Sequence, residues 1–402
     1  MQKKILKNGI VMLYDKKVSN SVVIEITFRV GSNYEKNNVL GISHFLEHLL
    51  FDGTKTRNSR QIAFEIEKYG GEINALTTNE RTSFYVRLPK KHFKIGLDIL
   101  SDIILNPLFL QEEIDKEKSI IFEEINMIND TPMYYQWILF VKTIFKVSNA
   151  RHPVYGSKET IKALSRDDII DYYQTHYNAN NMIVTVTGDA PLDIFSLIEE
   201  NFKDFRKGQN LVMEEVIEPQ ANKVETAKEK KNVDHTYIVL GYKTPNRSHK
   251  DSFALDLIRV ILGGGMSSRL FNEIRLKRAL AYNVGVQHDP NKNFGYLAVY
   301  VSCDHKNVEL CKEIILRELS NLQNITEQEL EDAKTYIEGQ FLLENEDNIK
   351  RADNMSSFEV SCFVEVFESF LNHIRTVTLE DIKRVAKEYL NEFYTLVTLE
   401  EK

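Results

Sequence analysis

The sequence is poor in cysteine. Its 402 residues include three cysteines, Cys303, Cys311 and Cys362, and none of them forms a C-x-x-C pair. A sparse, odd set argues against a disulfide framework and against a zinc site built from thiolates. It is typical of reduced thiols in a cytosol-like compartment, so we expect a cytoplasmic protein.

Long hydrophobic runs and basic clusters are also missing. No stretch approaches the roughly 20 apolar residues that span a bilayer, and residues 1–9 lack the apolar core of a secretory signal peptide. The formal net charge is -8 and the basic run at 228–231 is short. We therefore expect neither a membrane nor a nucleic-acid partner. An acidic balance mildly favours basic or neutral peptides as partners.

What is present indicates a folded chain of two similar halves. The composition, 43% hydrophobic and 27% charged, is that of a globular protein, and 402 residues exceed one ordinary core. Residues 22–30 and 236–242 both read as strands rich in β-branched residues. The halves match best at their ends, where 165–186 parallels 378–399 at a constant offset of 213 residues (168 to 381 and 185 to 398).

In both matching segments a Ser or Thr precedes acidic residues that start a helix, and a strand follows. A common helix–strand unit can arise by chance, but the constant offset favours duplication. We predict an α+β fold of two similar domains, each an antiparallel sheet packed with helices. The regular pattern lapses near Pro219 and the charged run 225–231, which we interpret as exposed linker. The predicted division is 1–212, a linker at 213–232, and 233–402.

The segment 41–53 carries the residues with distinctive chemistry. At about 100° per residue, His44, Glu47 and His48 occupy one arc of a helix, and apolar residues occupy the opposite arc. Two histidines at i and i+4 can bind one Zn²⁺, and the glutamate between them can act as general base. The alternative is a polar face that carries two histidines by chance. Gly53 is placed to end the helix.

A third ligand must come from another segment. The helical stretch 111–127 contains Glu117 and Glu124, seven residues apart and on one face to within about 20°. Glu123 points about 100° away from Glu124. One carboxylate of the pair can bind zinc while the other accepts a hydrogen bond from an imidazole. A plain acidic helix surface is the alternative.

This combination resembles the pitrilysin and mitochondrial processing peptidase family of inverzincin zinc peptidases. The resemblance rests on His44-x-x-Glu47-His48 and on the spacing of Glu117 and Glu124 from that motif. It implies one Zn²⁺ per chain, held by His44, His48 and Glu124. It also implies that Glu117 orients a histidine ring and that Glu47 takes a proton from the attacking water.

Two more segments of the first half share the resemblance. Residues 70–77 resemble the edge strand on which the family lays its substrate, and 152–156 resemble a family turn. An extended peptide is then expected to bind beside Asn74, Ala75 and Leu76, because an exposed sheet edge offers unpaired backbone groups.

The second half contributes a different set. Gly263, Gly264 and Gly265 resemble the family's Gly-rich loop, and Arg275 and Tyr282 resemble its Arg and Tyr pair. The pair is expected to bind substrate carbonyls or the developing oxyanion. Taken singly, the glycines can form an ordinary turn and Arg275 can be an ion-pair partner.

The resemblance implies a zinc metalloendopeptidase that hydrolyses extended, unfolded peptides or presequences. Shifted by about 214 residues, the zinc helix falls on 255–262, which has neither His nor Glu, so only the first half is expected to bind metal. The chain resembles the two-domain, half-length branch, in which two chains pair, and we expect a homodimer because both motif sets are present. The alternatives are a non-catalytic scaffold or partner subunit of the same fold, and a zinc-stabilised binding module.

Overall fold

The computed structural model describes residues 1–209 and 216–402. The chain folds into two compact units, and each half of the sequence contributes to both. The first unit comprises Met1–Asn126, the described part of 152–214, and Glu344–Val364; the second comprises Met127–Arg151, the described part of 215–343, and Glu365–Lys402. The predicted boundary at 212–213 lies outside the described residues, and the division at that boundary stays a prediction.

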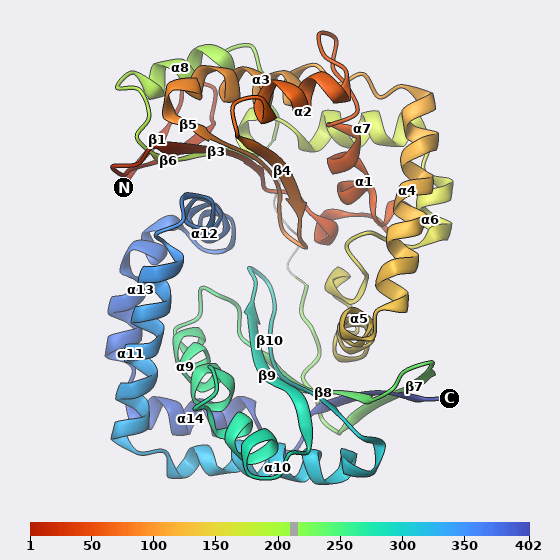
Figure 1. The fold of residues 1–402 in the computed structure, drawn as a ribbon, viewed down its shortest axis with the longest axis vertical. Coiled ribbons are helices and arrows are strands. Elements are labelled where there is room, and N and C mark those ends of the chain that lie inside the picture. The colour runs from red at the N-terminus through yellow and green to blue at the C-terminus, as the bar shows by residue number, and fades with distance from the viewer. Residues whose placement is uncertain (210–215) are drawn as a thin grey trace. The chain divides into compact units, whose positions relative to one another are not determined.

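The first unit is built on a six-stranded sheet (Figure 1). Its β2–β6 pair is parallel, whereas the other neighbours are antiparallel. The strands, in spatial order, are β1 (Gln2–Ile5), β2 (Val11–Lys16), β6 (Met182–Gly188), β3 (Ser21–Phe28), β5 (Thr82–Pro89) and β4 (Glu72–Thr77). Strand β4 therefore forms one edge of this sheet, as the resemblance implied for 70–77.

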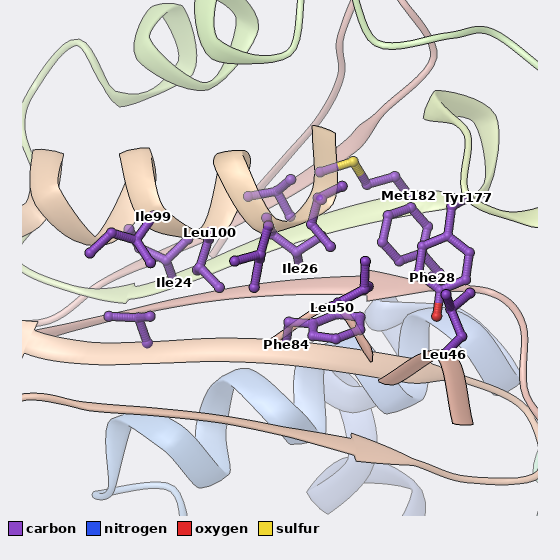
Figure 2. Close-up of a cluster of buried hydrophobic side chains, with 14 of the residues drawn as sticks. Ile24, Ile26, Phe28, Leu46, Leu50, Phe84, Ile99, Leu100, Tyr177 and Met182 are labelled. Atoms are coloured by element: carbon purple, nitrogen blue, oxygen red, sulfur yellow. The ribbon is translucent and has the colours of Figure 1, made fainter. Parts of the chain in front are cut away.

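Alternation along β3 separates an apolar face of the sheet from a polar one. Ile24, Ile26 and Phe28 enter the main core with residues of α3 (Phe93–Leu105), as Figure 2 shows. The remaining helices that contribute to this unit are α1 (Ile42–Leu49), α2 (Ser59–Glu67), α4 (Gln111–Asp130), α6 (Lys158–Ala163), α7 (Arg166–His176) and α8 (Ile194–Asn201).

The polar face of the same sheet is covered by α12 (Asn348–Ser361), a helix from the second half of the sequence. Arg81, the residue before β5, donates to Asp353 of α12 at 2.6 Å. The hydroxyls of Thr185 in β6 and Ser356 in α12 are 2.8 Å apart. These two contacts pair buried polar groups of the sheet with side chains of α12, as their burial favours.

The second unit repeats the arrangement around a five-stranded sheet. Its strands, in spatial order, are β7 (Glu225–Lys231), β11 (Thr395–Glu401), β8 (Thr236–Thr244), β10 (Gly295–Cys303) and β9 (Ala281–Pro290). One face packs against helices of the second half, and the other packs against α5 from the first half through Trp137, Phe140 and Tyr296. The helices of this unit are α5 (Pro132–Ile144), α9 (Asp251–Gly263), α10 (Val308–Ser320), α11 (Glu327–Glu344), α13 (Val364–Thr376) and α14 (Leu379–Tyr389).

The α+β prediction of two similar halves is confirmed. The order β2-β6-β3-β5-β4 corresponds to β7-β11-β8-β10-β9, with the parallel pair at the same place in each. The predicted helix starts both carry capping boxes, Ser165 with Asp168 and Thr378 with Asp381. An antiparallel sheet was predicted in each half, and each sheet is antiparallel except for one parallel pair, β2–β6 in the first and β7–β11 in the second.

The interpretation of 225–231 as exposed linker is wrong. This segment is β7, an edge strand parallel to β11. Exposed and half-buried residues alternate along it, but nearly all of them are charged or polar. The period of two is therefore hidden in the sequence, and charged residues are the type that protects a sheet edge from aggregation.

Among the described residues, no helix combines the length and the apolar composition that crossing a membrane requires.

Candidate metal and catalytic centre

Helix α1 starts with an unusual cap. Its N-cap residue, Gly41, has a φ of 94° and no capping side chain. A Cβ at this position would lie 2.6 Å from the carbonyl oxygen of Tyr155, in the predicted turn 152–156. Instead, the buried carboxylate of Glu35 accepts hydrogen bonds from the N–H groups of Gly41 (2.7 Å) and Ser43 (2.8 Å).

Glu35 was not identified from the sequence. Its signal was indirect: with glycine at the N-cap, the first N–H groups of α1 need an acceptor from elsewhere. Burial raises the pKa of Glu35 to about 7, against the lowering effect of the two N–H donors. The helix ends at Leu49, earlier than the predicted stop at Gly53.

The faces of α1 are those predicted. Ile42, Phe45, Leu46 and Leu49 are buried in the core of the first unit, and Leu46 is visible there in Figure 2. Packing of this apolar face fixes the rotation of the helix. The polar residues 44, 47 and 48 are only partly buried and lie on its other side.

His44, His48 and Glu124 converge on one point. The Nε2 atoms of His44 and His48 lie 3.7 and 3.8 Å from Glu124 Oε2. In a tetrahedral zinc site with bonds of about 2.0–2.2 Å, ligand atoms lie about 3.3–3.5 Å apart, so the set needs little adjustment. Among the described residues this is the one group of His, Cys, Asp and Glu side chains that could hold a metal ion.

The protonation of His44 suits a metal ligand. Burial, and then the neighbouring His48, lower the pKa of His44 to about 3, so its ring is neutral at physiological pH. Its approach to Glu124 is therefore not an ion pair. A neutral imidazole and a carboxylate directed at one point are donors for a shared cation. The residues present fit Zn²⁺.

Glu117 lies behind His48, on the side away from Glu124. Its Oε2 is 3.1 Å from His48 Nδ1, and the side chain is buried. Burial acts to lower the pKa of His48, but the hydrogen bond to Glu117 and the charges of Glu47, Glu117 and Glu124 outweigh it, so the pKa is raised. This contact engages Nδ1 and leaves Nε2 of His48 on the side of Glu124.

Glu47 stands beside the metal group and is not part of it. Its Oε2 accepts a hydrogen bond from the hydroxyl of Thr77, the last residue of β4. Burial raises the pKa of Glu47, and the hydrogen bond from Thr77 acts against this rise. Thr77 was not singled out from the sequence, because nothing local connects it to a residue thirty positions away.

The three residues predicted to receive a peptide lie on the edge strand β4, which packs against α1. Asn74 is exposed, whereas Ala75 and Leu76 are partly buried. Asn74 Oδ1 accepts a hydrogen bond from the N–H of Ala75 at 2.9 Å. A side chain therefore occupies a donor that an added strand would use.

The second unit brings Arg275 and Tyr282 together. Arg275, in the π-helical turn Phe271–Leu276, donates to the carbonyl oxygen of Tyr282 at 2.8 Å and lies over its ring at 4.6 Å. Tyr282 is 81% exposed. Gly263 ends α9, and Gly264 and Gly265 continue the chain from it.

Comparisons with known proteins match both halves. Residues 10–154 match the family model "Insulinase (Peptidase family M16)", and residues 163–337 match "Peptidase M16 inactive domain". An uncharacterized zinc protease of Rickettsia felis is 31% identical over 398 residues, which cover 97% of this chain and 95% of the relative. The uncharacterized zinc protease YmxG of Bacillus subtilis is 29% identical, covering 98% and 96%.

Solved structures share the fold. A protease from Helicobacter pylori superposes with a TM-score of 0.93 at 24% identity, covering 99% of both chains. A structure from Pseudomonas fluorescens, described as a peptidase M16 inactive domain, gives a TM-score of 0.90 at 19% identity, covering 100% of this chain and 98% of that one.

Proposed function

The chain belongs to the M16 family of peptidases, and from this premise we propose that it is a zinc-dependent endopeptidase for extended, unfolded peptides or presequences. The observation that carries the proposal is the convergence of His44, His48 and Glu124, with Glu117 behind His48 and Glu47 beside the group. Three protein ligands leave a fourth position open, which is the arrangement of catalytic rather than structural zinc sites.

Each residue of the site has a role in this proposal. His44, His48 and Glu124 would hold one zinc ion per chain, which would act as a Lewis acid, lowering the pKa of a water and polarising a carbonyl. Glu47 accepts a proton from the attacking water and passes it to the leaving amine as the peptide bond breaks. Glu117 accepts a hydrogen bond from the Nδ1–H group of His48. This bond selects the tautomer in which Nε2 carries no proton and is free to bind the metal.

The substrate is proposed to add to the sheet as a strand beside Asn74, Ala75 and Leu76. Strand addition recognises backbone N–H and C=O groups and so requires an unfolded segment. The position of β4 at the edge of its sheet and against α1 supports this placement.

The second unit is proposed to act on the substrate through Arg275 and Tyr282, with Gly263, Gly264 and Gly265 shaping the adjacent loop. The exposure of the Tyr282 ring supports a role in contacting another molecule. We propose that two chains form a homodimer in which this pair serves the partner's zinc site. Three buried, unlinked cysteines fit a reducing compartment, and we propose the cytoplasm.

The alternative is a non-catalytic scaffold or partner subunit of the same fold. Purified protein is mixed with a library of quenched-fluorescent peptides, with and without a metal chelator. Hydrolysis that stops on chelation and returns with added Zn²⁺ supports the peptidase. A zinc-loaded protein that cleaves no peptide in the library contradicts it and favours the scaffold.

A further inference from the structure

Glu47, the proposed general base, is hydrogen-bonded to β4, the strand proposed to receive the peptide. Thr77 closes β4, where it pairs with Thr82 of β5, and its hydroxyl donates to Glu47 Oε2. No other hydrogen bond to the Glu47 carboxylate is formed within the part of the chain that the structure describes. The contact therefore joins α1 to β4 at a single side-chain bond.

The hydrogen bond limits what the Glu47 carboxylate can do. A glutamate side chain loses on the order of 1.5–2 kcal/mol of rotamer freedom when it is fixed in one conformation. Thr77 is well suited to fix it, since a β-branched side chain in a strand has few χ1 choices. With Oε2 engaged by the hydroxyl, Oε1 is the oxygen left to accept a proton from water.

The rate of proton transfer to a general base depends strongly on where its carboxylate lies. A general base must come within about 2.6–3.2 Å of the proton's donor atom, and a misplacement of about 1 Å can cost about 100-fold in rate. Ala75, whose N–H lies at the proposed peptide edge, is two residues before Thr77 on the same strand. A displacement of β4 would thus move the bound peptide and the Thr77 hydroxyl that fixes Glu47 by the same amount.

We propose that Thr77 is a positioning residue, which fixes the Glu47 carboxylate at a set position relative to the peptide-binding edge of β4. The inference rests on the proposed peptidase function. It differs from a purely structural role, in which the Thr77 hydroxyl would only strengthen the contact between α1 and β4. A structural role affects stability, whereas positioning affects the chemical step.

The test compares Thr77→Val with Thr77→Ser in the full chain loaded with zinc. We expect Thr77→Val to lower kcat by about 10- to 100-fold with KM and zinc content near wild type, because the base is misplaced while binding is intact. Thr77→Ser keeps a hydroxyl and is expected to recover most of kcat. Thr82→Val is the matched control, since the Thr82 hydroxyl donates to the Val30 carbonyl at 2.9 Å and not to Glu47.

Crystal structures of the two Thr77 variants give a readout that does not depend on activity. The Glu47 carboxylate is expected to keep its position in Thr77→Ser and to leave it in Thr77→Val. Wild-type kcat in Thr77→Val, equal losses in both variants, or an unmoved Glu47 carboxylate in Thr77→Val would overturn the inference. If the wild type cleaves no peptide, the proposed function fails, while the position of Glu47 in the two crystal structures still decides the inference.

Discussion

At the scale of single residues, two glutamates on one face of α4 have different environments. Glu124 directs Oε2 at the Nε2 atoms of both histidines, and Glu117 directs Oε2 at Nδ1 of His48. Helix spacing alone predicted that they share a face but left open which of them is the ligand. The distances support Glu124 as the ligand and Glu117 as the residue that orients the ring.

Glutamine substitutions of the two glutamates should therefore have different effects on zinc binding. Glu124→Gln removes the charge of the proposed ligand, and we expect this variant to lose zinc. Glu117→Gln keeps an oxygen acceptor near His48, and we expect zinc affinity or activity to fall by about 10- to 100-fold. Zinc content by atomic absorption and a zinc titration measure both. Equal and complete loss of metal in the two variants would contradict this assignment.

The contribution of Glu35, which caps α1, to the stability of the protein should depend on pH. Burial raises its pKa from 4.5 to about 7, so the folded state binds the proton more tightly than the unfolded state. Its contribution to stability is present below pH 4.5 and is lost as the pH rises through 7. Relative to Glu35→Gln, the free energy of unfolding of the wild type should fall by about 3 kcal/mol over this range. Denaturant titrations from pH 4.5 to 8 measure it, and a constant difference between the two proteins would refute it.

At the scale of helices and strands, local patterns predicted what local physics determines. The faces of α1 and α4 follow from helical periodicity, and the caps at Ser165 and Thr378 follow from the need of helix ends for acceptors. Glu35 and Thr77 could not be predicted, because each acts on α1 through a contact that exists only after the chain has folded. Strand β7 was missed because its two faces are both polar.

Strand β4 offers a test of peptide addition. Proline at position 75 removes the Ala75 N–H, which bonds to the Asn74 side chain, and an edge strand tolerates proline where its N–H faces outward. We expect Ala75→Pro to raise KM about tenfold, the value of one hydrogen bond, with kcat and melting temperature little changed. Ala75→Gly retains the N–H and serves as the control. A folded Ala75→Pro protein with wild-type KM would rule out a hydrogen bond from this N–H to the substrate.

At the scale of the whole molecule, each half of the sequence supplies a helix to the sheet of the other half. Helix α5 meets its sheet through aromatic residues, whereas α12 meets its own through ion pairs and hydroxyls. The sequence predicted the duplicated sheets but not this exchange. An amphipathic helix shows which of its faces is buried, and it does not show which sheet will cover that face.

Pairing of two chains can be tested by complementation. If Arg275 and Tyr282 of one chain serve the zinc site of the other, Glu47→Gln and Tyr282→Phe should restore each other on mixing. About half of the dimers are then mixed and each has one complete site, so recovery approaches about a quarter of wild-type activity. Mixing Glu47→Gln with the double variant is the control and should restore nothing. No recovery after verified subunit exchange would place both groups in one chain's site.

The central claim is that His44, His48 and Glu124 bind the zinc while Glu47 performs the proton transfer. The most direct measurement is zinc content and peptide hydrolysis on the same samples of wild type and Glu47→Gln. We expect one zinc per chain in both proteins, with hydrolysis by the wild type and none detectable in the variant. Loss of zinc in Glu47→Gln would make this residue a ligand, and undiminished hydrolysis in a zinc-loaded variant would show that the base lies elsewhere.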